Sequence, residues 1–160
     1  MRLFADPRFR LAGPVAVAVL IADQVTKAVV ARAMTLHQSI PLTPFAAFTY
    51  ERNTGAAFSM LAAAPSVVRS WLFVVVTLFA LGVLISYLRQ AASDQRVLVA
   101  ALGGILGGAL GNLVCRVRYG EVIDFMDIHW GALHWPVFNV ADSAITVGVT
   151  VVLVHSLRAR

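Results

Sequence analysis

The sequence predicts an all-α integral membrane protein, a single domain over residues 1–160 with four transmembrane helices. Hydrophobic residues make up 59% of the chain and charged residues only 13%, whereas a soluble domain has about 25% charged residues. The mean hydropathy is +0.81. The apolar residues fall into four stretches, each close to the roughly 20 residues that a helix needs to cross a bilayer.

The first apolar stretch follows several arginines and could be taken for a cleaved signal peptide. Its apolar character resumes past Lys27, however, and no small-residue cleavage site follows. We therefore expect a retained helix. The expected spans are Leu11–Ala31, Ser70–Leu88, Val97–Val114 and Val137–Leu157.

The arginines predict how these helices are oriented. Seven lie in the N-terminus, the connection "RQAASDQR" and the C-terminus, and five lie on the other side, in loops of about 32–69 and 115–136. Because positively charged loops stay in the cytoplasm, both termini are predicted to be cytoplasmic and the two long loops to face outward. The net charge of +5 does not indicate nucleic-acid binding, since the basic residues form no patch.

The two outer loops carry weaker structural signals. The segment "SIPLTPFAAFTYERNTGAAFSML" is rich in Phe, Thr and Tyr, so short strands are expected there, as a small sheet that could hold an extended peptide. The segment "APSVVRSW" is expected to form a short helical lead into the second span, with Ser66 as its cap. Trp130 and Trp135 are expected at the outer membrane interface.

Charged and polar side chains are found at one level of the predicted spans. In the first span, Asp23 and Lys27 are four residues apart and share a helical face, which favours a neutralised structural pair. Glycines in the third span are expected to let that helix pack closely against its neighbours. They are Gly103, Gly104, Gly107, Gly108 and Gly111.

Further polar residues converge on the outer ends of the third and fourth spans. Asn112 and Arg116 share one stripe of the third helix, and Asn139 and Asp142 lie at helical spacing in the fourth. Asp142 is expected one to two turns below the outer surface, with Asp124 in the loop just above it. Because charged residues within spans are rare and usually functional, the sequence predicts a polar pocket at the outer face.

The pair Asp124 and Asp142 indicates a specific chemistry. Repulsion between two nearby carboxylates keeps one of them protonated. The ionised member can then take a proton from water while the protonated member polarises a substrate carbonyl, as in an aspartic peptidase. Asn112, Arg116 and Asn139 could hold the pair and the developing oxyanion. No metal and no cofactor are needed.

Three other functions are less favoured by the residues. A Ser/Lys peptidase would use Lys27 with Ser59 or Ser143, but Asp23 one turn away favours the charged lysine. A small proton-coupled transporter would need polar groups through the whole membrane, and "ALGVLISYL" and "VGVTVVLV" offer almost none. A non-enzymatic membrane scaffold leaves the clustered aspartates unexplained.

A metal site is also not expected. His129 and His134 are five residues apart, a poor spacing for two ligands on one helical face. Cys115 is the only cysteine, which excludes an internal disulfide and a Cys-rich metal site.

Five sequence blocks, taken in order, resemble the lipoprotein signal peptidases, the type II signal peptidases of bacteria. The resemblance covers nearly the whole chain. The blocks are "DQVTK" at 23–27, "NTGAAFS" at 53–59, "GNLVCR" at 111–116, "VIDF" at 122–125 and "FNVADS" at 138–143.

This resemblance implies a multi-pass enzyme of the bacterial inner membrane, with a small periplasmic sheet, a short periplasmic helix and a periplasmic active site. It implies an aspartic endopeptidase that removes signal peptides from prolipoproteins just before the diacylglyceryl-modified cysteine. Asp124 and Asp142 match the family's catalytic pair, and Asp23 matches a position of structural importance. Membrane lipids and globomycin-type cyclic peptide inhibitors are implied partners. The positions that match the family's substrate pocket are Asn53, Gly55, Asn112, Arg116, Asn139 and Ala141.

The chain departs from the family pattern at one position in the third span. The family usually has Asn-x-x-Asp-Arg, and here Cys115 replaces the aspartate before Arg116. We therefore expect Glu121 or Asp127 in the following loop to neutralise Arg116. Restoring the acid with Cys115→Asp is expected to be neutral or stabilising.

Overall fold

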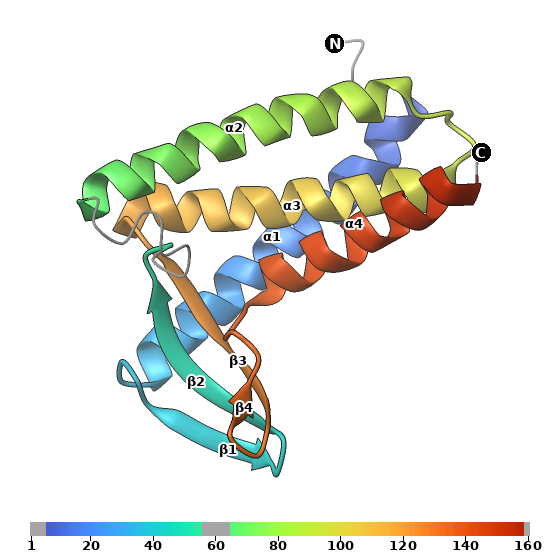
Figure 1. Ribbon diagram of the computed structural model, residues 1–160. Coiled ribbons are helices and arrows are strands. Elements are labelled where there is room, and N and C mark those ends of the chain that lie inside the picture. The colour runs from blue at the N-terminus through green and yellow to red at the C-terminus, as the bar shows by residue number, and fades with distance from the viewer. Residues whose placement is uncertain (1–5, 56–64, 159–160) are drawn as a thin grey trace.

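The protein folds into four long helices with a small antiparallel sheet at one end of them (Figure 1). The computed structural model describes residues 6–55 and 65–158. Each helix is long and apolar enough to cross a membrane, so the four predicted spans are confirmed. The helices are α1 (Pro7–Ala33), α2 (Ser66–Gln90), α3 (Arg96–Tyr119) and α4 (Val140–Arg158).

α3 lies at the centre of the helical bundle and packs against the other three helices. Gly103 and Gly107 of α3 face the α1 backbone, and a Cβ atom at Gly103 would lie 2.6 Å from the carbonyl oxygen of Ala12. A Cβ atom at Gly108 would meet the carbonyl oxygen of Ala141 in α4 at 2.5 Å. The predicted role of the glycines in close helix packing is therefore confirmed at these positions.

The sheet has the strand order β1-β2-β3-β4, and we call the end of the bundle that it adjoins the sheet end. Neighbouring strands are antiparallel, and in the β2–β3 pair Glu51 lies opposite Asp124. Val30 at the end of α1 packs with Tyr50 of β2 and Phe125 of β3, so the sheet is attached to the bundle by apolar contacts. The strands are β1 (Ser39–Thr43), β2 (Ala46–Asn53), β3 (Val122–Trp130) and β4 (Leu133–His134).

The strands expected in the first long loop are confirmed, whereas the second long loop contains two strands that its residues did not predict. The helix starts also differ from the predicted starts of the spans. α4 begins at Val140 rather than Val137, because Pro136 precedes a segment whose Phe138 backbone is paired with Met126 of β3. Asp142 consequently lies in the first turn of α4.

Ser66 does not cap a separate helix. It is the first helical residue of α2, and Pro65 occupies the cap position. Of the segment predicted as a short helical lead, the part that the structure describes, residues 65–71, is the beginning of α2.

Candidate active site

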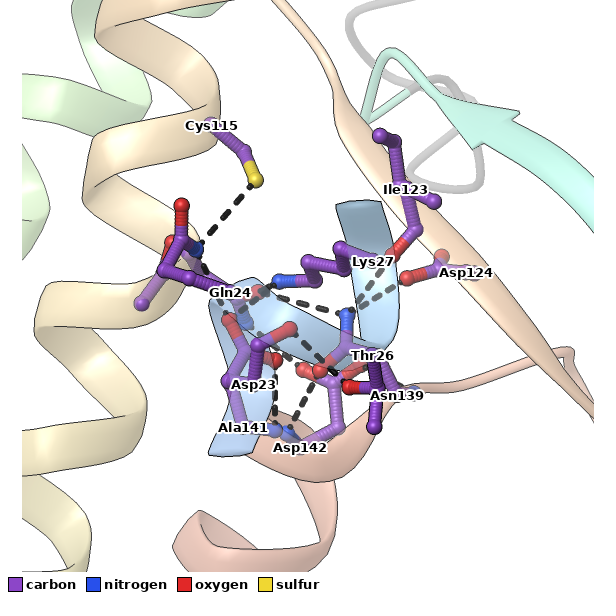
Figure 2. A network of polar contacts seen from close by, with 12 residues as sticks. Asp23, Gln24, Thr26, Lys27, Cys115, Ile123, Asp124, Asn139, Ala141 and Asp142 are labelled. Atoms are coloured by element: carbon purple, nitrogen blue, oxygen red, sulfur yellow. Dashed lines mark hydrogen bonds and ion pairs between the residues drawn. The ribbon is translucent and has the colours of Figure 1, made fainter. Parts of the chain in front are cut away.

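Two carboxylates distant in the sequence lie where the sheet meets the helices. Asp124 is on β3 and is only 2% exposed, while Asp142 is in the first turn of α4. Between them lies Asn139, which directly precedes α4 and is fully buried (Figure 2). The predicted convergence of these three residues is thus present in the fold.

Asn139 and Asp142 start α4 as a reciprocal pair. The backbone N–H of Asp142 donates to Oδ1 of Asn139 at 3.0 Å, and the backbone N–H of Asn139 donates to Oδ2 of Asp142 at 3.2 Å. This is the geometry of a capping box, which satisfies two helix N-terminal N–H groups at once. The position of the Asp142 carboxylate is therefore fixed by the helix start itself.

The same Asn139 side chain also binds the second carboxylate. Its Nδ2 donates to Oδ1 of Asp124 at 2.7 Å, and Nδ2 of Asn53, at the end of β2, donates to the other oxygen, Oδ2, at 3.0 Å. Oδ1 of Asn53 in turn accepts from the backbone N–H of Gly55 at 2.8 Å. Gly55 has φ +79°, which favours glycine, and a Cβ atom there would overlap the Phe73 ring.

A buried ion pair in α1, between Lys27 and Asp23, contacts the site through Asn112. Nζ of Lys27 lies 2.8 Å from Oδ2 of Asp23, and both side chains are almost fully buried, so the predicted pair is confirmed. Lys27 also donates to Oδ1 of Asn112 at 2.8 Å, and Nδ2 of Asn112 donates to Oδ1 of Asp142 at 2.8 Å. The chain of contacts from α1 through α3 to α4 orients the amide of Asn112, because its oxygen faces the ammonium.

The second oxygen of Asp23 anchors the start of α4. Its Oδ1 accepts from the backbone N–H of Ala141 at 3.0 Å, and Ala141 is fully buried. Gln24, which the sequence did not single out, donates from Nε2 to Oδ2 of Asp23 and to the carbonyl oxygen of Gly111, both at 3.0 Å. Ala141 therefore contributes its backbone rather than its side chain.

Arg116 does not contact either of the two acids that were predicted to neutralise its charge. Its guanidinium carbon lies 4.3 Å from the centroid of the Phe73 ring, and its Nη1 has no hydrogen-bond partner among the described residues. Its charge is nevertheless close enough to interact favourably with Asp124 and Asp142. The expectation that Glu121 or Asp127 pairs with Arg116 is wrong.

Those two acids have other partners. Oε1 of Glu121 lies 2.8 Å from Nη1 of Arg52, and Asp127 contacts His134. Cys115 is buried, and its Sγ accepts a long contact of 3.7 Å from Nε2 of Gln24. The outcome of Cys115→Asp stays a prediction.

The electrostatics distinguish Asp124 from an ordinary surface acid. Burial, reinforced by the nearby carboxylate of Asp142, raises the pKa of Asp124 to about 6, although the hydrogen bonds from Asn53 and Asn139 act in the opposite direction. A carboxyl group with such a pKa can hold or release a proton near neutral pH. Two carboxylates linked in this way can therefore carry one proton between them.

The structure brings together the two histidines that the sequence had set aside as metal ligands. His129 and His134 lie opposite each other on β3 and β4, with Asp127 beside them. The spacing argument against them assumed a helix, and the segment is a β-hairpin. This cluster is separate from the two carboxylates of the polar network.

The lysine in the first span has no serine among its partners in the described residues. Nζ of Lys27 is bound to Asp23 and Asn112, while the hydroxyl of Ser143 donates to the carbonyl oxygen of Asn139 at 3.0 Å. Ser59 lies outside the described residues. The described geometry therefore offers no support for a Lys27/Ser143 peptidase.

The chain is similar to known proteins over almost its whole length. The family model described as signal peptidase (SPase) II matches residues 15–158. The lipoprotein signal peptidase of Geobacter sulfurreducens is 48% identical over 153 residues, covering 95% of this chain and 94% of that protein. The lipoprotein signal peptidase of Syntrophus aciditrophicus is 46% identical over 141 residues, 88% of each protein.

Two solved structures of bacterial membrane enzymes share the fold. One is 33% identical with a TM-score of 0.83 and covers 93% of this chain and 94% of its own. The other is 34% identical with a TM-score of 0.81 and covers 92% of this chain and 87% of its own.

Proposed function

Because this chain belongs to the signal peptidase II family, we propose that it cleaves diacylglyceryl-modified prolipoproteins just before the lipidated cysteine, using Asp124 and Asp142 as an aspartic dyad. Membership makes the chain a peptidase and, with its four apolar helices, a multi-pass bacterial membrane protein. The observation that carries the proposal is the placement of both carboxylates on one buried asparagine, Asn139.

The two carboxylates take different roles in this mechanism. Asp124 has a pKa raised to about 6, so we assign the shared proton to it. Asp142 accepts hydrogen bonds from Nδ2 of Asn112 and the backbone N–H of Asn139, which fix the position of its carboxylate. Asp142 is accordingly the general base and Asp124 the general acid.

In the first step Asp142 takes a proton from a water molecule, whose oxygen attacks the scissile carbonyl carbon. Asp124 gives its proton to the carbonyl oxygen, which yields a neutral tetrahedral diol. In the second step Asp142 passes its proton to the leaving nitrogen, the carbon–nitrogen bond breaks, and one diol hydroxyl returns its proton to Asp124. The products are the carboxyl terminus of the signal peptide and the free amine of the lipidated cysteine, with both aspartates in their starting states.

Arg116 supports this chemistry through its charge. It makes no hydrogen bond to either carboxylate in the described structure, but it interacts with both at longer range. A positive charge at that place stabilises the negative charge that moves between the two aspartates during the reaction. Its buried Nη1, which has no hydrogen-bond partner among the described residues, is also available to a substrate carbonyl oxygen.

Two apolar cavities suit the parts of a lipidated peptide, and Asp142 is among the lining residues of one of them. The first, of about 290 Å³, has Asp142, Trp135 and Phe138 among its lining residues. The other, of about 340 Å³, lies between the end of α1 and the sheet, with Val30, Phe48 and Phe125 among its lining residues. We assign the first to the peptide, where globomycin-type cyclic peptides would compete, and the second to an acyl chain.

We place both termini in the cytoplasm and the sheet end at the periplasmic face. Support comes from the distribution of arginines and from the need to meet exported substrates. Single cysteines at Ser39 and Ala132, both exposed at the sheet end, should react with a membrane-impermeant thiol reagent in a Cys115→Ala background. A cysteine at Ser93, in the α2–α3 connection, should not react, and the reverse pattern would invert the topology.

The function is tested by incubating the purified protein with a diacylated prolipoprotein and with the same protein lacking the lipid. Mass spectrometry should find cleavage of the lipidated form only, with the modified cysteine as the new N-terminus. Equal cleavage of both forms would leave a peptidase that does not recognise lipid, and cleavage of neither would overturn the proposal.

A further inference from the structure

A cluster of potential metal ligands lies on the β3–β4 hairpin, apart from the aspartic dyad. His129 and His134 are directly paired across the two strands, so their side chains lie on the same face. Asp127 is two residues before His129 on β3 and therefore also shares that face. One ligand atom from each residue can be chosen such that all three lie within 4.8 Å of one another.

The distances within the cluster suit a tetrahedral ion. Nδ1 of His134 lies 3.0 Å and Nδ1 of His129 lies 3.8 Å from Oδ1 of Asp127. Two ligands bound to Zn²⁺ at about 2.0 Å lie about 3.3 Å apart in tetrahedral geometry. The imidazole rings are stacked, with centroids 4.9 Å apart, and the His134 side chain is exposed.

Two further observations indicate that a ligand binds to this cluster. Nδ1 of His129 is buried and has no hydrogen-bond partner among the described residues, and such a group in a folded protein calls for a partner. Oδ2 of Asp127 lies 3.4 Å from Oγ1 of Thr49 on β2, which orients the carboxylate with Oδ1 toward the histidines. Hydrogen bonds of this kind position metal-binding carboxylates.

We propose that Asp127, His129 and His134 form a binding site for Zn²⁺ or a similar transition-metal ion. Two imidazoles and one carboxylate favour Zn²⁺, Cu²⁺ or Ni²⁺ over Mg²⁺ and Ca²⁺, which prefer oxygen ligands. The site leaves a fourth coordination position to water.

This metal site plays no part in the cleavage chemistry. Side chains alternate between the two faces of a strand, so Asp127 and Asp124, three residues apart on β3, point to opposite faces. The ion instead links β4 to β3, which carries Asp124 and pairs through Met126 with Phe138, the residue before Asn139. Its role is to stiffen the hairpin that supports the site.

The proposal is tested on the full-length protein, purified in detergent with an affinity tag that contains no histidine. Titration with Co²⁺, followed by visible absorbance and then by Zn²⁺ competition, should give one ion per chain. His129→Ala and His134→Asn should each weaken binding at least about 100-fold, since loss of a supporting hydrogen bond alone weakens metal binding about 10–100-fold. Thermal unfolding without metal checks that both variants fold.

His37→Ala is the matched control. Nδ1 of His37 likewise lies 3.0 Å from a carboxylate oxygen, Oε2 of Glu51, but no second histidine joins this pair in a ligand cluster among the described residues. The His37→Ala variant should bind Zn²⁺ like the wild type. Its Tm should rise on addition of Zn²⁺ by the same amount as that of the wild type. Asp142→Asn should also bind Zn²⁺ normally, so the outcome is independent of the peptidase activity. Absence of 1:1 binding, or binding that survives both His129→Ala and His134→Asn, would overturn the site.

Discussion

At the sheet end, α1, α3 and α4 meet through polar side chains, whereas at the opposite end they meet through glycines and aliphatic side chains. The first half of α3 buries Leu98 and Leu102 and presents Gly103 to α1. Nearer its C-terminal end, the same helix presents Asn112 to Lys27 and Asp142. One helix thus packs the bundle with its first half and orders the polar site with its second.

The difference between the two ends indicates what each contributes. Apolar packing offers no hydrogen-bond partner to a buried polar group, and among the described residues the opposite end buries few polar side chains. At the sheet end, buried charges have specific partners, such as Asp23 with Lys27, because an unpaired buried charge is costly. Changes at the sheet end should therefore affect activity, and changes at the opposite end only stability.

The largest effect is expected from the dyad itself. Asp124→Asn and Asp142→Asn should each lower the rate of prolipoprotein cleavage by about 10²–10⁴-fold or more, because each removes a proton-transfer group that the other cannot replace. The control is Asp94→Asn in the α2–α3 connection, the same change at the opposite end, which should cleave like the wild type. Substantial turnover by either variant would contradict the assignment of Asp124 and Asp142 as the catalytic pair.

The next largest effect is expected from the buried ion pair. Lys27→Met leaves the Asp23 carboxylate buried without its cation, which costs about 3–5 kcal/mol in stability. Because Lys27 also orients Asn112, the fraction that stays folded should cleave more slowly. Thermal unfolding in detergent and the cleavage rate per folded molecule measure the two effects. A stable and fully active Lys27→Met protein would show that the Asp23–Lys27 ion pair is needed neither for folding nor for the arrangement of the site.

A smaller effect, on stability alone, is expected at the opposite end. A side chain at Gly107 would overlap the backbone of Ala16, so Gly107→Val should destabilise the bundle by about 1–3 kcal/mol. The cleavage rate per folded molecule should not change. The control, Gly104→Ala, has no atom nearer than 3.9 Å to the new Cβ and should unfold like the wild type. A loss of cleavage rate per folded molecule in Gly107→Val would contradict the expectation that the opposite end affects stability only.

The smallest effect is expected at Cys115. In Cys115→Asp the new carboxylate can accept from the Gln24 amide that now contacts the thiol, and it adds a negative charge next to Arg116. A hydrogen bond of about 1–3 kcal/mol is set against a desolvation cost of similar size, so Tm and activity should be unchanged or higher. A clear drop in Tm with lost cleavage would mean that the chain has repacked around the cysteine.

The sequence predicted the helices and the polar convergence because both follow from local pattern. Twenty-residue apolar stretches have few alternative structures, and Asn112 and Asp142 are polar where the surrounding residues are apolar. The pattern "NVAD" also carried a capping-box signal that would have placed the start of α4 at Val140. The predicted start at Val137 is instead the first apolar residue after Pro136.

What the sequence could not predict depends on contacts between distant segments. Glu121 pairs with Arg52 rather than Arg116 because β2 lies beside β3, and no local pattern gives that pairing. His129 and His134 come together only because residues 122–134 form a hairpin. The periodicity of a helix, assumed for them, gave the wrong geometry.

If Asp124 and Asp142 work as a pair holding one proton, the pH dependence of kcat/KM reports the loss of that proton. Raising the pH through the pKa of Asp124, about 6, removes the shared proton, so kcat/KM should fall above that pH. The Asn53 hydrogen bond lowers the pKa of Asp124. In Asn53→Ala that pKa should rise and the fall in kcat/KM should move to higher pH, while Gln38→Ala, which removes another amide at the sheet end, should leave the profile unchanged. A fall that stays in place or moves to lower pH in Asn53→Ala would contradict the shared-proton pair.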